Sequence, residues 1–109
     1  IRIAIATEGY NGLEDTVSPI FGKSKTFTLV NIENGKIANV RVIDNPVAAF
    51  KRGSGSIASK TLADLRIDKV ITVQIGPGAL ELLEYHKIKT IIIDPGKTVA
   101  ESIREALSR

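Results

Sequence analysis

The sequence predicts an α/β fold built on a five-stranded mixed sheet, and three observations support this prediction. Two short apolar runs, 70–75 and 88–93, have the Val, Ile and Thr content of buried parallel strands, and a helical segment follows each of them. A third apolar run covers residues 2–6. Asn34-Gly35 lies between two strand-like segments and is the strongest short signal for an antiparallel hairpin. Strands that alternate with helices are typical of a parallel sheet, to which the hairpin adds antiparallel strands.

The composition restricts the classes of protein to which the chain can belong. A length of 109 residues, with 43% hydrophobic and 25% charged residues, is typical of one globular domain spanning 1–109. The chain has no cysteine, which excludes disulfides, thiolate-bound metals and a cysteine nucleophile. Its single histidine leaves no cluster for zinc. No apolar run approaches the roughly 20 residues of a membrane span and no signal-peptide pattern is present, so we expect a cytoplasmic protein.

The charge is modest and gives little information about partners. A net charge of +3 is a weak indication of anionic ligands. No Lys/Arg-dense run with interleaved aromatic residues predicts a nucleic-acid interface. The lack of Cys, Met and Trp, together with abundant Ile, is typical of a thermophilic protein.

The segment 7–24 connects the first strand to the hairpin and is predicted to be a long loop. Loops of this length in a compact domain are usually functional or mobile. Its central part, 17–22, is apolar enough to pack against the rest of the domain.

The predicted hairpin spans Thr26 to Asp44, and a type I′ turn at Asn34-Gly35 would fix its register. The cross-strand pairs expected from this turn are Phe27–Val42, Leu29–Val40 and Asn31–Ala38 on one face, and Thr28–Arg41, Val30–Asn39 and Ile32–Ile37 on the other. One face is then mainly apolar and the other mixed, as a sheet packed on one side requires.

Three helices are predicted after the hairpin. The first follows the loop 45–55, with Ser54 or Ser56 as its N-cap. The second begins at Pro77, because proline suits the first helical position. The third follows Thr98, and the sequence 98–101 (Thr-Val-Ala-Glu) matches a capping box.

Right-handed crossovers make the strands at 2–6, 70–75 and 88–93 mutually parallel. The most economical sheet order is then 3-2-1-4-5 with strand 2 antiparallel and helices on the faces, which is the arrangement of a ribonuclease H-like motif. In this topology four loops meet at the C-terminal end of the parallel strands, where open α/β sheets bind ligands. These loops are 7–25, 44–55, 76–78 and 94–98.

The turn Gly76-Pro77-Gly78 is the first candidate for a binding site. A strand that passes directly into a helix leaves unpaired N–H groups and a positive dipole end at the edge of the sheet, which suits an anion. The alternative is that the turn needs glycine only for its geometry. The basic residues Lys23, Lys25, Lys51, Arg52 and Lys97 lie at the same end, where they are either anion contacts or ordinary solvated charges. Acidic residues offset them, so backbone N–H groups would have to supply much of the attraction.

Catalytic chemistry has little support. A nuclease with two metal ions needs a carboxylate on the first strand, and 2–6 contains none. His86 ends the second helix at the opposite end of the sheet and is better explained as a surface residue. We therefore predict no catalytic residue and no metal ligand.

Three segments resemble a known family in their order and spacing. They are Val17-Ser18-Pro19-Ile20-Phe21-Gly22-Lys23-Ser24, the loop 44–55 with its Asp-Asn-Pro and Gly-Ser-Gly sequences, and 70–83 with its Ile-Gly-Pro-Gly turn. Over nearly the whole chain the sequence resembles the dinitrogenase iron-molybdenum cofactor-binding (cofactor biosynthesis) family. The resemblance implies a ribonuclease H-like fold and a non-catalytic module that carries or chaperones an anionic cluster of the iron-molybdenum or iron-sulfur type, with a protein acceptor as partner. Without cysteine or a loop histidine, this chain would have to hold a cluster by other groups.

The expected site is the mouth formed by 21–25, 51–55 and 76–78. Its candidate residues are Phe21, Gly22, Lys23, Lys25, Arg52, Gly53, Ser54, Gly55, Gly76, Pro77 and Gly78. Two other functions stay open. One is a phosphate- or nucleotide-binding regulatory domain that uses the N–H groups of Gly78 and Thr98. The other is a protein-interaction domain that pairs through the edge strand 37–43. The sequence leaves the oligomeric state open.

Overall fold

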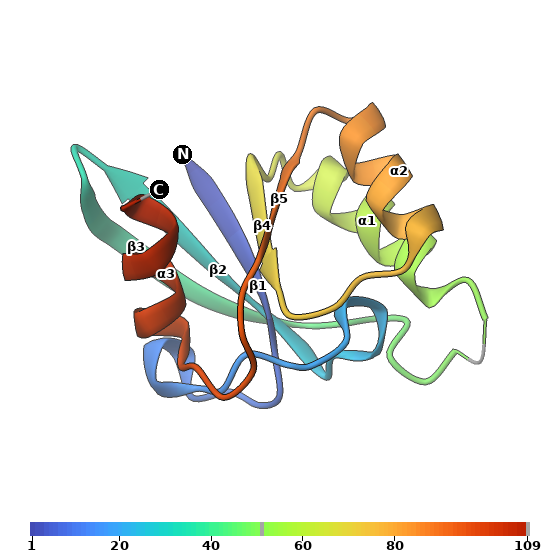
Figure 1. Cartoon of the computed structure of the whole chain (residues 1–109), viewed down its shortest axis with the longest axis horizontal. Coiled ribbons are helices and arrows are strands. Elements are labelled where there is room, and N and C mark those ends of the chain that lie inside the picture. Colours follow the sequence, from blue (N-terminus) through green and yellow to red (C-terminus); the bar gives the residue numbers. More distant parts are fainter. Residues whose placement is uncertain (51, 109) are drawn as a thin grey trace.

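The computed structural model describes residues 1–50 and 52–108 and confirms the predicted α/β architecture (Figure 1). Five strands form one sheet in the order β3-β2-β1-β4-β5. β1 is parallel to β4 and β4 to β5, whereas β2 is antiparallel to both of its neighbours. This is the order predicted for a ribonuclease H-like motif. The strands are β1 (Arg2–Thr7), β2 (Thr26–Glu33), β3 (Lys36–Asp44), β4 (Lys69–Thr72) and β5 (Lys89–Ile92).

Helices cover both faces of the sheet. α1 (Ser54–Asp64) and α2 (Pro77–Tyr85) lie side by side on one face, and α3 (Val99–Leu107) lies on the other. Two short 3-10 helices, η1 (Gly12–Glu14) and η2 (Phe21–Lys23), form part of the loop between β1 and β2. None of the helices in the described part of the chain is long and apolar enough to cross a bilayer.

The central strand β1 contributes to a separate hydrophobic core on each face of the sheet. Ala4 and Ala6 belong to the core beneath α1 and α2, whereas Ile3 and Ile5 belong to the core beneath α3. All four side chains are fully buried, as the alternation of side chains along a strand requires when both faces are covered.

The hairpin forms over the predicted residues, but most of its predicted register is wrong. Next to the turn, Ile32 pairs with Ile37 as predicted. A β-bulge follows, because Asn31 pairs with Asn39 and Ala38 is left over. The remaining pairs are therefore shifted by one residue, to Val30–Val40, Leu29–Arg41, Thr28–Val42 and Phe27–Ile43. A turn determines the register only as far as the first irregularity in the ladder.

The observed boundaries of α1, α2 and β4 can be compared with those predicted from the sequence. α2 begins at Pro77, as predicted. α1 has no serine cap, because Gly53 occupies the N-cap position with a left-handed φ of 72° and Ser54 is already helical. β4 ends at Thr72 rather than at residue 75. The carbonyl of Gln74 instead accepts a hydrogen bond from the N–H of Phe21, at 2.9 Å, which ties η2 to the loop before α2.

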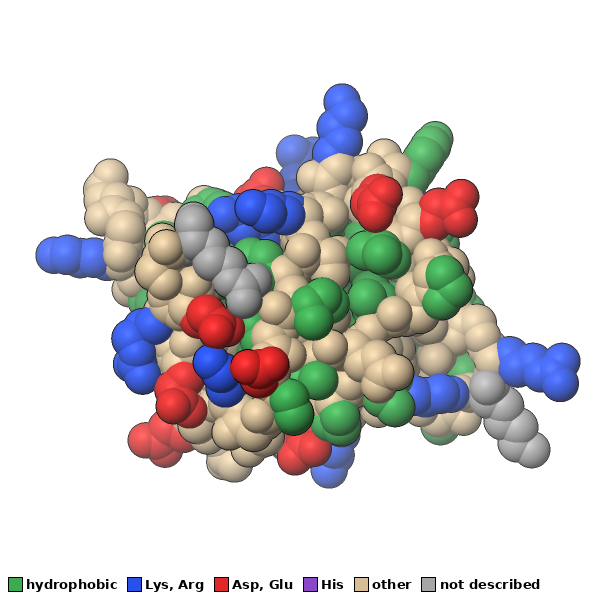
Figure 2. Space-filling view, in the orientation of Figure 1, with side chains coloured by type: hydrophobic (Ala, Val, Ile, Leu, Met, Phe, Trp, Pro, Cys, Tyr) green, Lys and Arg blue, Asp and Glu red, His purple; other side chains and the backbone are tan. Residues whose placement is uncertain are grey.

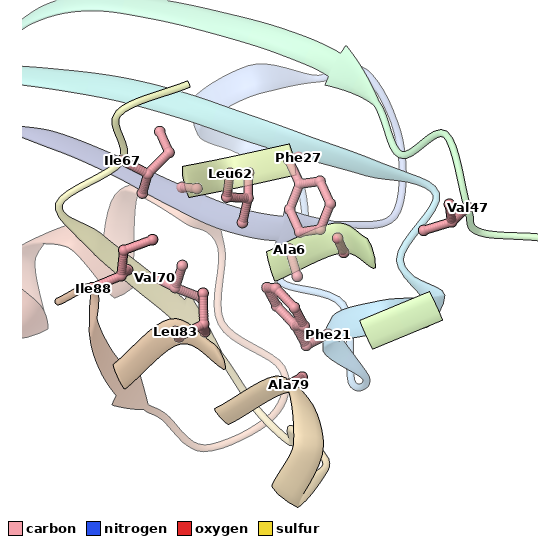
Figure 3. Packing of buried hydrophobic residues seen from close by; sticks show 12 residues of the cluster. Ala6, Phe21, Phe27, Val47, Leu62, Ile67, Val70, Ala79, Leu83 and Ile88 are labelled. Carbon is pink, nitrogen blue, oxygen red and sulfur yellow. The ribbon is translucent and has the colours of Figure 1, made fainter. Parts of the chain in front are cut away.

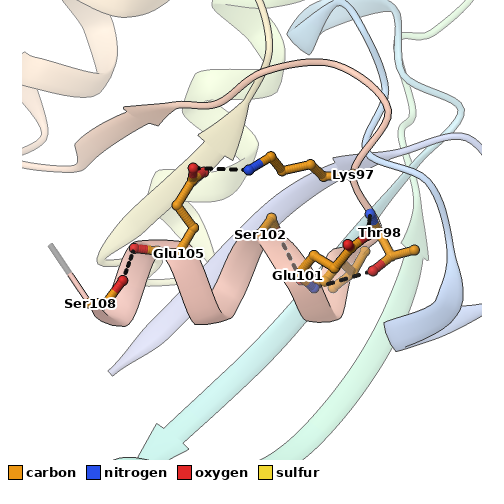
Figure 4. Close-up of polar contacts among 7 residues, drawn as sticks. Lys97, Thr98, Glu101, Ser102, Glu105 and Ser108 are labelled. Carbon is orange, nitrogen blue, oxygen red and sulfur yellow. Dashed lines mark hydrogen bonds and ion pairs between the residues drawn. The ribbon is translucent and has the colours of Figure 1, made fainter.

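α3 begins with the predicted capping box (Figure 4). The N–H of Glu101 donates to Thr98 Oγ1 at 3.2 Å, and the N–H of Thr98 donates to Glu101 Oε1 at 3.0 Å. Two hydrogen bonds with Thr98 lower the pKa of Glu101 from its ordinary value. The bond from the Thr98 backbone has the larger effect, and the bond with the Thr98 side chain has the smaller one. The charged carboxylate is therefore favoured in the folded state.

Replacing Thr98 by alanine is expected to lower the free energy of unfolding by about 1 kcal/mol at neutral pH. Because the pKa of Glu101 is lower in the folded state, its contribution is present above the unfolded pKa and is lost as the pH falls through the folded pKa. Urea unfolding of both proteins should therefore show a smaller difference in strong acid than at neutral pH. A difference of the same size at both pH values would show that the charge of Glu101 plays no part.

Candidate functional site

Three predicted segments meet at the C-terminal end of the parallel strands and enclose a hollow of about 280 Å³. They are the η2 region, the start of α1 and the start of α2. We call this space the helix-terminus hollow, because two helices begin there. Its lining residues are Ile20, Phe21, Gly22, Lys23, Gly53, Ser54, Gly55, Ser56, Gly76, Gly78 and Ala79.

Eight of the eleven predicted site residues line this hollow. Lys25, Arg52 and Pro77 do not. Lys25 lines a neighbouring hollow, Arg52 is exposed, and Pro77 occupies the first position of α2. The Lys51 contact considered from the sequence lies outside the described residues. Ile20, Ser56 and Ala79 were not predicted, although each is adjacent in sequence to a predicted residue.

The two helices are held close together by small residues at their starts. A Cβ on Gly55 would lie 3.0 Å from the Cβ of Ala79, so the helices approach too closely for most side chains. The buried hydroxyl of Ser59 lies 2.9 Å from the carbonyl oxygen of Gly55 and 3.1 Å from that of Ala79. The sequence analysis did not predict this role of Ser59. The only indication in the sequence is that a polar residue stands next to the apolar positions of the helix.

Main-chain N–H groups are the principal donors at the hollow. Neither α1 nor α2 has a side-chain cap. Their first intrahelical hydrogen bonds run from the N–H of Ile57 to Gly53 and from the N–H of Leu80 to Gly76. The N–H groups of 54–56 and 78–79 precede these bonds and have no acceptor within their helices. The positive ends of two helix dipoles therefore converge at the same space.

Ser54 adds a side-chain donor. The residue is only 6% exposed, yet its hydroxyl has no hydrogen-bond partner among residues 1–50 and 52–108. Because Ser54 lines the hollow, this hydroxyl is available to a bound group.

The glycines at the hollow have two different roles. A Cβ on Gly22 would lie 2.6 Å from the backbone nitrogen of Gly55 and 2.9 Å from Ser54 Oγ, so glycine is required there for η2 to pack on α1. Gly76 has an ordinary φ of −73°, and a Cβ there would meet no atom within 4 Å. Neither backbone conformation nor packing therefore requires glycine at position 76. Its missing side chain leaves open space at the wall of the hollow.

Phe21 belongs to the hydrophobic core as well as to the site (Figure 3). Its side chain is fully buried, and the centroid of its ring lies 5.5 Å from that of Phe27. Because no part of the ring reaches solvent, Phe21 supports the hollow from beneath.

Charged side chains contribute less than the main chain. Lys23 is the one charged residue among the described residues that line the hollow, and its Nζ donates to the carbonyl oxygen of Phe50. On the face of the molecule shown in Figure 2, basic and acidic side chains are both spread over the surface. The electrostatic attraction at the hollow therefore comes mainly from backbone dipoles.

Metal coordination by side chains is not available at this site. Within the described parts of the chain, no three His, Asp or Glu residues are grouped so that they could hold a metal ion, and the sequence has no cysteine. The donors at the hollow are N–H groups, a hydroxyl and an ammonium group. They fit the outer oxygen or sulfur atoms of an anion, and they do not fit direct ligation of its metal.

The structure separates Gly78 from Thr98, which the nucleotide-binding hypothesis had combined. The N–H of Thr98 is already bonded to Glu101 within the capping box. α3 also lies on the face of the sheet opposite to α2. The two N–H groups therefore do not form one site.

The fold defines a small α/β protein with a ribonuclease H-like motif, and the hollow gives it one candidate site for an anion. The model of the family described as dinitrogenase iron-molybdenum cofactor matches residues 1–109. The chain belongs to this family, as the sequence resemblance predicted.

Individual relatives are similar in sequence or share the fold. An uncharacterized protein of Methanocaldococcus jannaschii is 33% identical over 91 residues, which cover 84% of this chain and 73% of the relative. The apo form of the orange protein from Desulfovibrio gigas superimposes with a TM-score of 0.87 at 29% identity, over 98% of this chain and 87% of the other. The crystal structure of PH0822 gives a TM-score of 0.83 at 28% identity, over 99% and 91% of the two chains.

Proposed function

We propose that residues 1–109 form a non-catalytic binding module that carries an anionic metal–sulfur cofactor, of the iron-molybdenum or iron-sulfur type, to a protein acceptor. Membership of the dinitrogenase iron-molybdenum cofactor family supports this class of ligand. The observation that carries the location of the site is the convergence of two uncapped helix N-termini on one hollow. Helix N-termini are well suited to bind anions.

Each part of the helix-terminus hollow has a role in this proposal. The N–H groups of 54–56 and 78–79 and the hydroxyl of Ser54 donate hydrogen bonds to surface sulfur or oxygen atoms of the ligand. Gly76 leaves room for the ligand to approach the main chain. Lys23 supplies positive charge at the rim, and Lys25 and Arg52 add to the positive charge of the surrounding loops.

Replacing Gly76 by alanine is expected to weaken binding roughly tenfold, because a methyl group enters the space kept for the ligand. The free energy of unfolding should change by less than about 0.5 kcal/mol, since the backbone conformation suits alanine and nothing lies in its way. Binding is measured by anaerobic titration with tetrathiomolybdate, the simplest molybdenum–sulfur anion, with backbone amide NMR shifts as the readout. Urea unfolding of the same samples gives the stability.

The titration also distinguishes the proposed function from the phosphate-binding alternative. Shifts of the amides in 53–56 and 76–79 support the proposal. Unchanged amides there, both with tetrathiomolybdate and with a preformed iron-sulfur cluster, would overturn it. Shifts with orthophosphate and nucleotides but not with the sulfur-containing anions would favour a phosphate-binding regulatory domain, which would use the N–H groups of this hollow without that of Thr98.

A further inference from the structure

Another hollow, of about 270 Å³, lies on the α1 side of the sheet, where the turn between β2 and β3 extends away from α1 and α2 (Figure 1). It is at the end opposite to the helix-terminus hollow, because it contains the first residue of β1. We infer that it binds an acidic peptide segment of a partner protein through two carboxylates. This inference does not rest on the proposed function. We call the space the sheet-face hollow, and its lining residues are Arg2, Leu29, Asn31, Asn39, Arg41 and Leu65.

The strand residues of the sheet-face hollow form two neighbouring rows across the sheet. Arg2 pairs with Asn31, which in turn pairs with Asn39. Leu29 pairs with Arg41 in the next row. Because residues paired across strands share a face of the sheet, two guanidinium groups and two carboxamides lie on one surface.

The β-bulge determines which residues of β3 face this hollow. In the register predicted from the turn, Ala38 and Val40 would lie there. The bulge instead brings Asn39 and Arg41 to this face and places Val40 on the other one, opposite Val30. Bulges are common next to functional sites, where they redirect side chains. The irregularity thus makes polar a surface that a regular hairpin would leave apolar.

The two guanidinium groups retain donors for a ligand. Arg2 Nη1 donates to the carbonyl oxygen of Leu65 at 2.9 Å, which fixes this side chain at the wall and leaves its other donors. In the described part of the chain, the side chain of Arg41 has no hydrogen bond or ion pair. The carboxylate of Asp68 lies nearby, but it accepts from the main-chain N–H of Arg2, at 2.8 Å, rather than from a guanidinium group. Guanidinium groups bind carboxylates through strong, charge-assisted hydrogen bonds.

The positions of the arginines favour a peptide with two acidic side chains. Arg2 and Arg41 come from β1 and β3, whose axes are about 10 Å apart because β2 lies between them. In an extended peptide, alternate side chains point the same way and are about 7 Å apart, a distance that long arginine side chains can match. The carboxamides of Asn31 and Asn39 donate and accept, so they suit the peptide groups between the acidic side chains. The two partly buried leucines form an apolar floor for the methylene groups of glutamate.

The test titrates the full chain with a capped peptide of sequence Ser-Glu-Ser-Glu-Ser. Backbone amide NMR shifts are expected at 29–31, 39–41 and 65, and not at 53–56 and 76–79. The same peptide with glutamine in place of both glutamates should bind about tenfold more weakly, because the charge-assisted hydrogen bonds are lost. Succinate, which has two carboxylates but no peptide groups, should also bind about tenfold more weakly.

Variants test the residues of the sheet-face hollow. Arg41→Gln should weaken binding of the glutamate peptide about tenfold. Arg104→Gln is the matched control, because it makes the same change on α3, on the other face of the sheet, and it should change binding less than about twofold. Asn39→Asp is a second variant at the hollow, and its carboxylate should repel the peptide and weaken binding by about tenfold or more.

The outcomes separate this inference from the proposed function. A glutamate peptide that shifts none of the amides around the sheet-face hollow would overturn the inference. Equal weakening by Arg41→Gln and Arg104→Gln would also overturn it, because only the net charge would then matter. Succinate that binds as tightly as the peptide would overturn the peptide as the occupant. Each of these results leaves the anion titration of the helix-terminus hollow unaffected, since that titration follows different amides.

Discussion

Replacing Phe21 by alanine is expected to lower the free energy of unfolding by about 3–5 kcal/mol. The ring is fully buried against Phe27, and it packs in the core that joins β1 to α1 and α2. Its removal leaves a cavity that the two helices and the sheet cannot close without moving. For a domain of this size the melting temperature should fall by roughly 12–25 °C. Urea and thermal unfolding, followed by circular dichroism, measure both quantities.

Phe50→Ala is the matched control for this change. Phe50 is 47% exposed, so the same loss of a phenyl ring should cost less than about 1 kcal/mol. Equal destabilisation by the two substitutions would mean that Phe21 is not packed as described. It would also remove the reason for regarding Phe21 as the support beneath the helix-terminus hollow.

Replacing Gly22 by alanine is expected to lower the free energy of unfolding by about 2–3 kcal/mol and to weaken anion binding. The new Cβ would lie 2.6 Å from the backbone nitrogen of Gly55 and 2.8 Å from its Cα. Both are main-chain atoms, so no side-chain rotation relieves the clash, and η2 must move away from α1. Unfolding experiments give the stability, and titration with tetrathiomolybdate gives the binding.

The control for Gly22→Ala is Gly76→Ala, the same chemical change at another wall of the hollow. The first variant should lose both stability and binding, and the second should lose binding alone. A Gly22→Ala protein as stable as the wild type would show that η2 does not pack closely on α1.

Much of the fold could be predicted because its signals are local or follow from handedness. Asn34-Gly35 predicts the hairpin, Pro77 the start of α2, and Thr98 with Glu101 the start of α3. Right-handed crossovers then give the sheet order. The register of the hairpin was not predictable in this way, because Ala38 in the bulge has no special conformational preference that distinguishes it from a regular strand residue.

The location of the candidate site could be predicted from the sequence, whereas most of the contacts within it could not. Topology alone brings the loops before α1 and α2 to one end of the sheet, so the segments of the hollow could be predicted. Three features of the site depend on how the helices pack. They are the bridge made by Ser59, the hydroxyl of Ser54 and the burial of Phe21. Such contacts join residues far apart in the chain, and no local pattern encodes them.

The bulge in β3 lies on an edge strand of the sheet, where another chain could add a strand. β3 is an edge strand of nine residues, most of them exposed, and regular edges of this length invite another chain to add a strand. The extra residue at Ala38 interrupts the even spacing of outward peptide groups, and Lys36 and Arg41 place charge on either side of it. The irregularity that shifts the hairpin register is therefore expected to disfavour open-ended, fibre-like association through this edge.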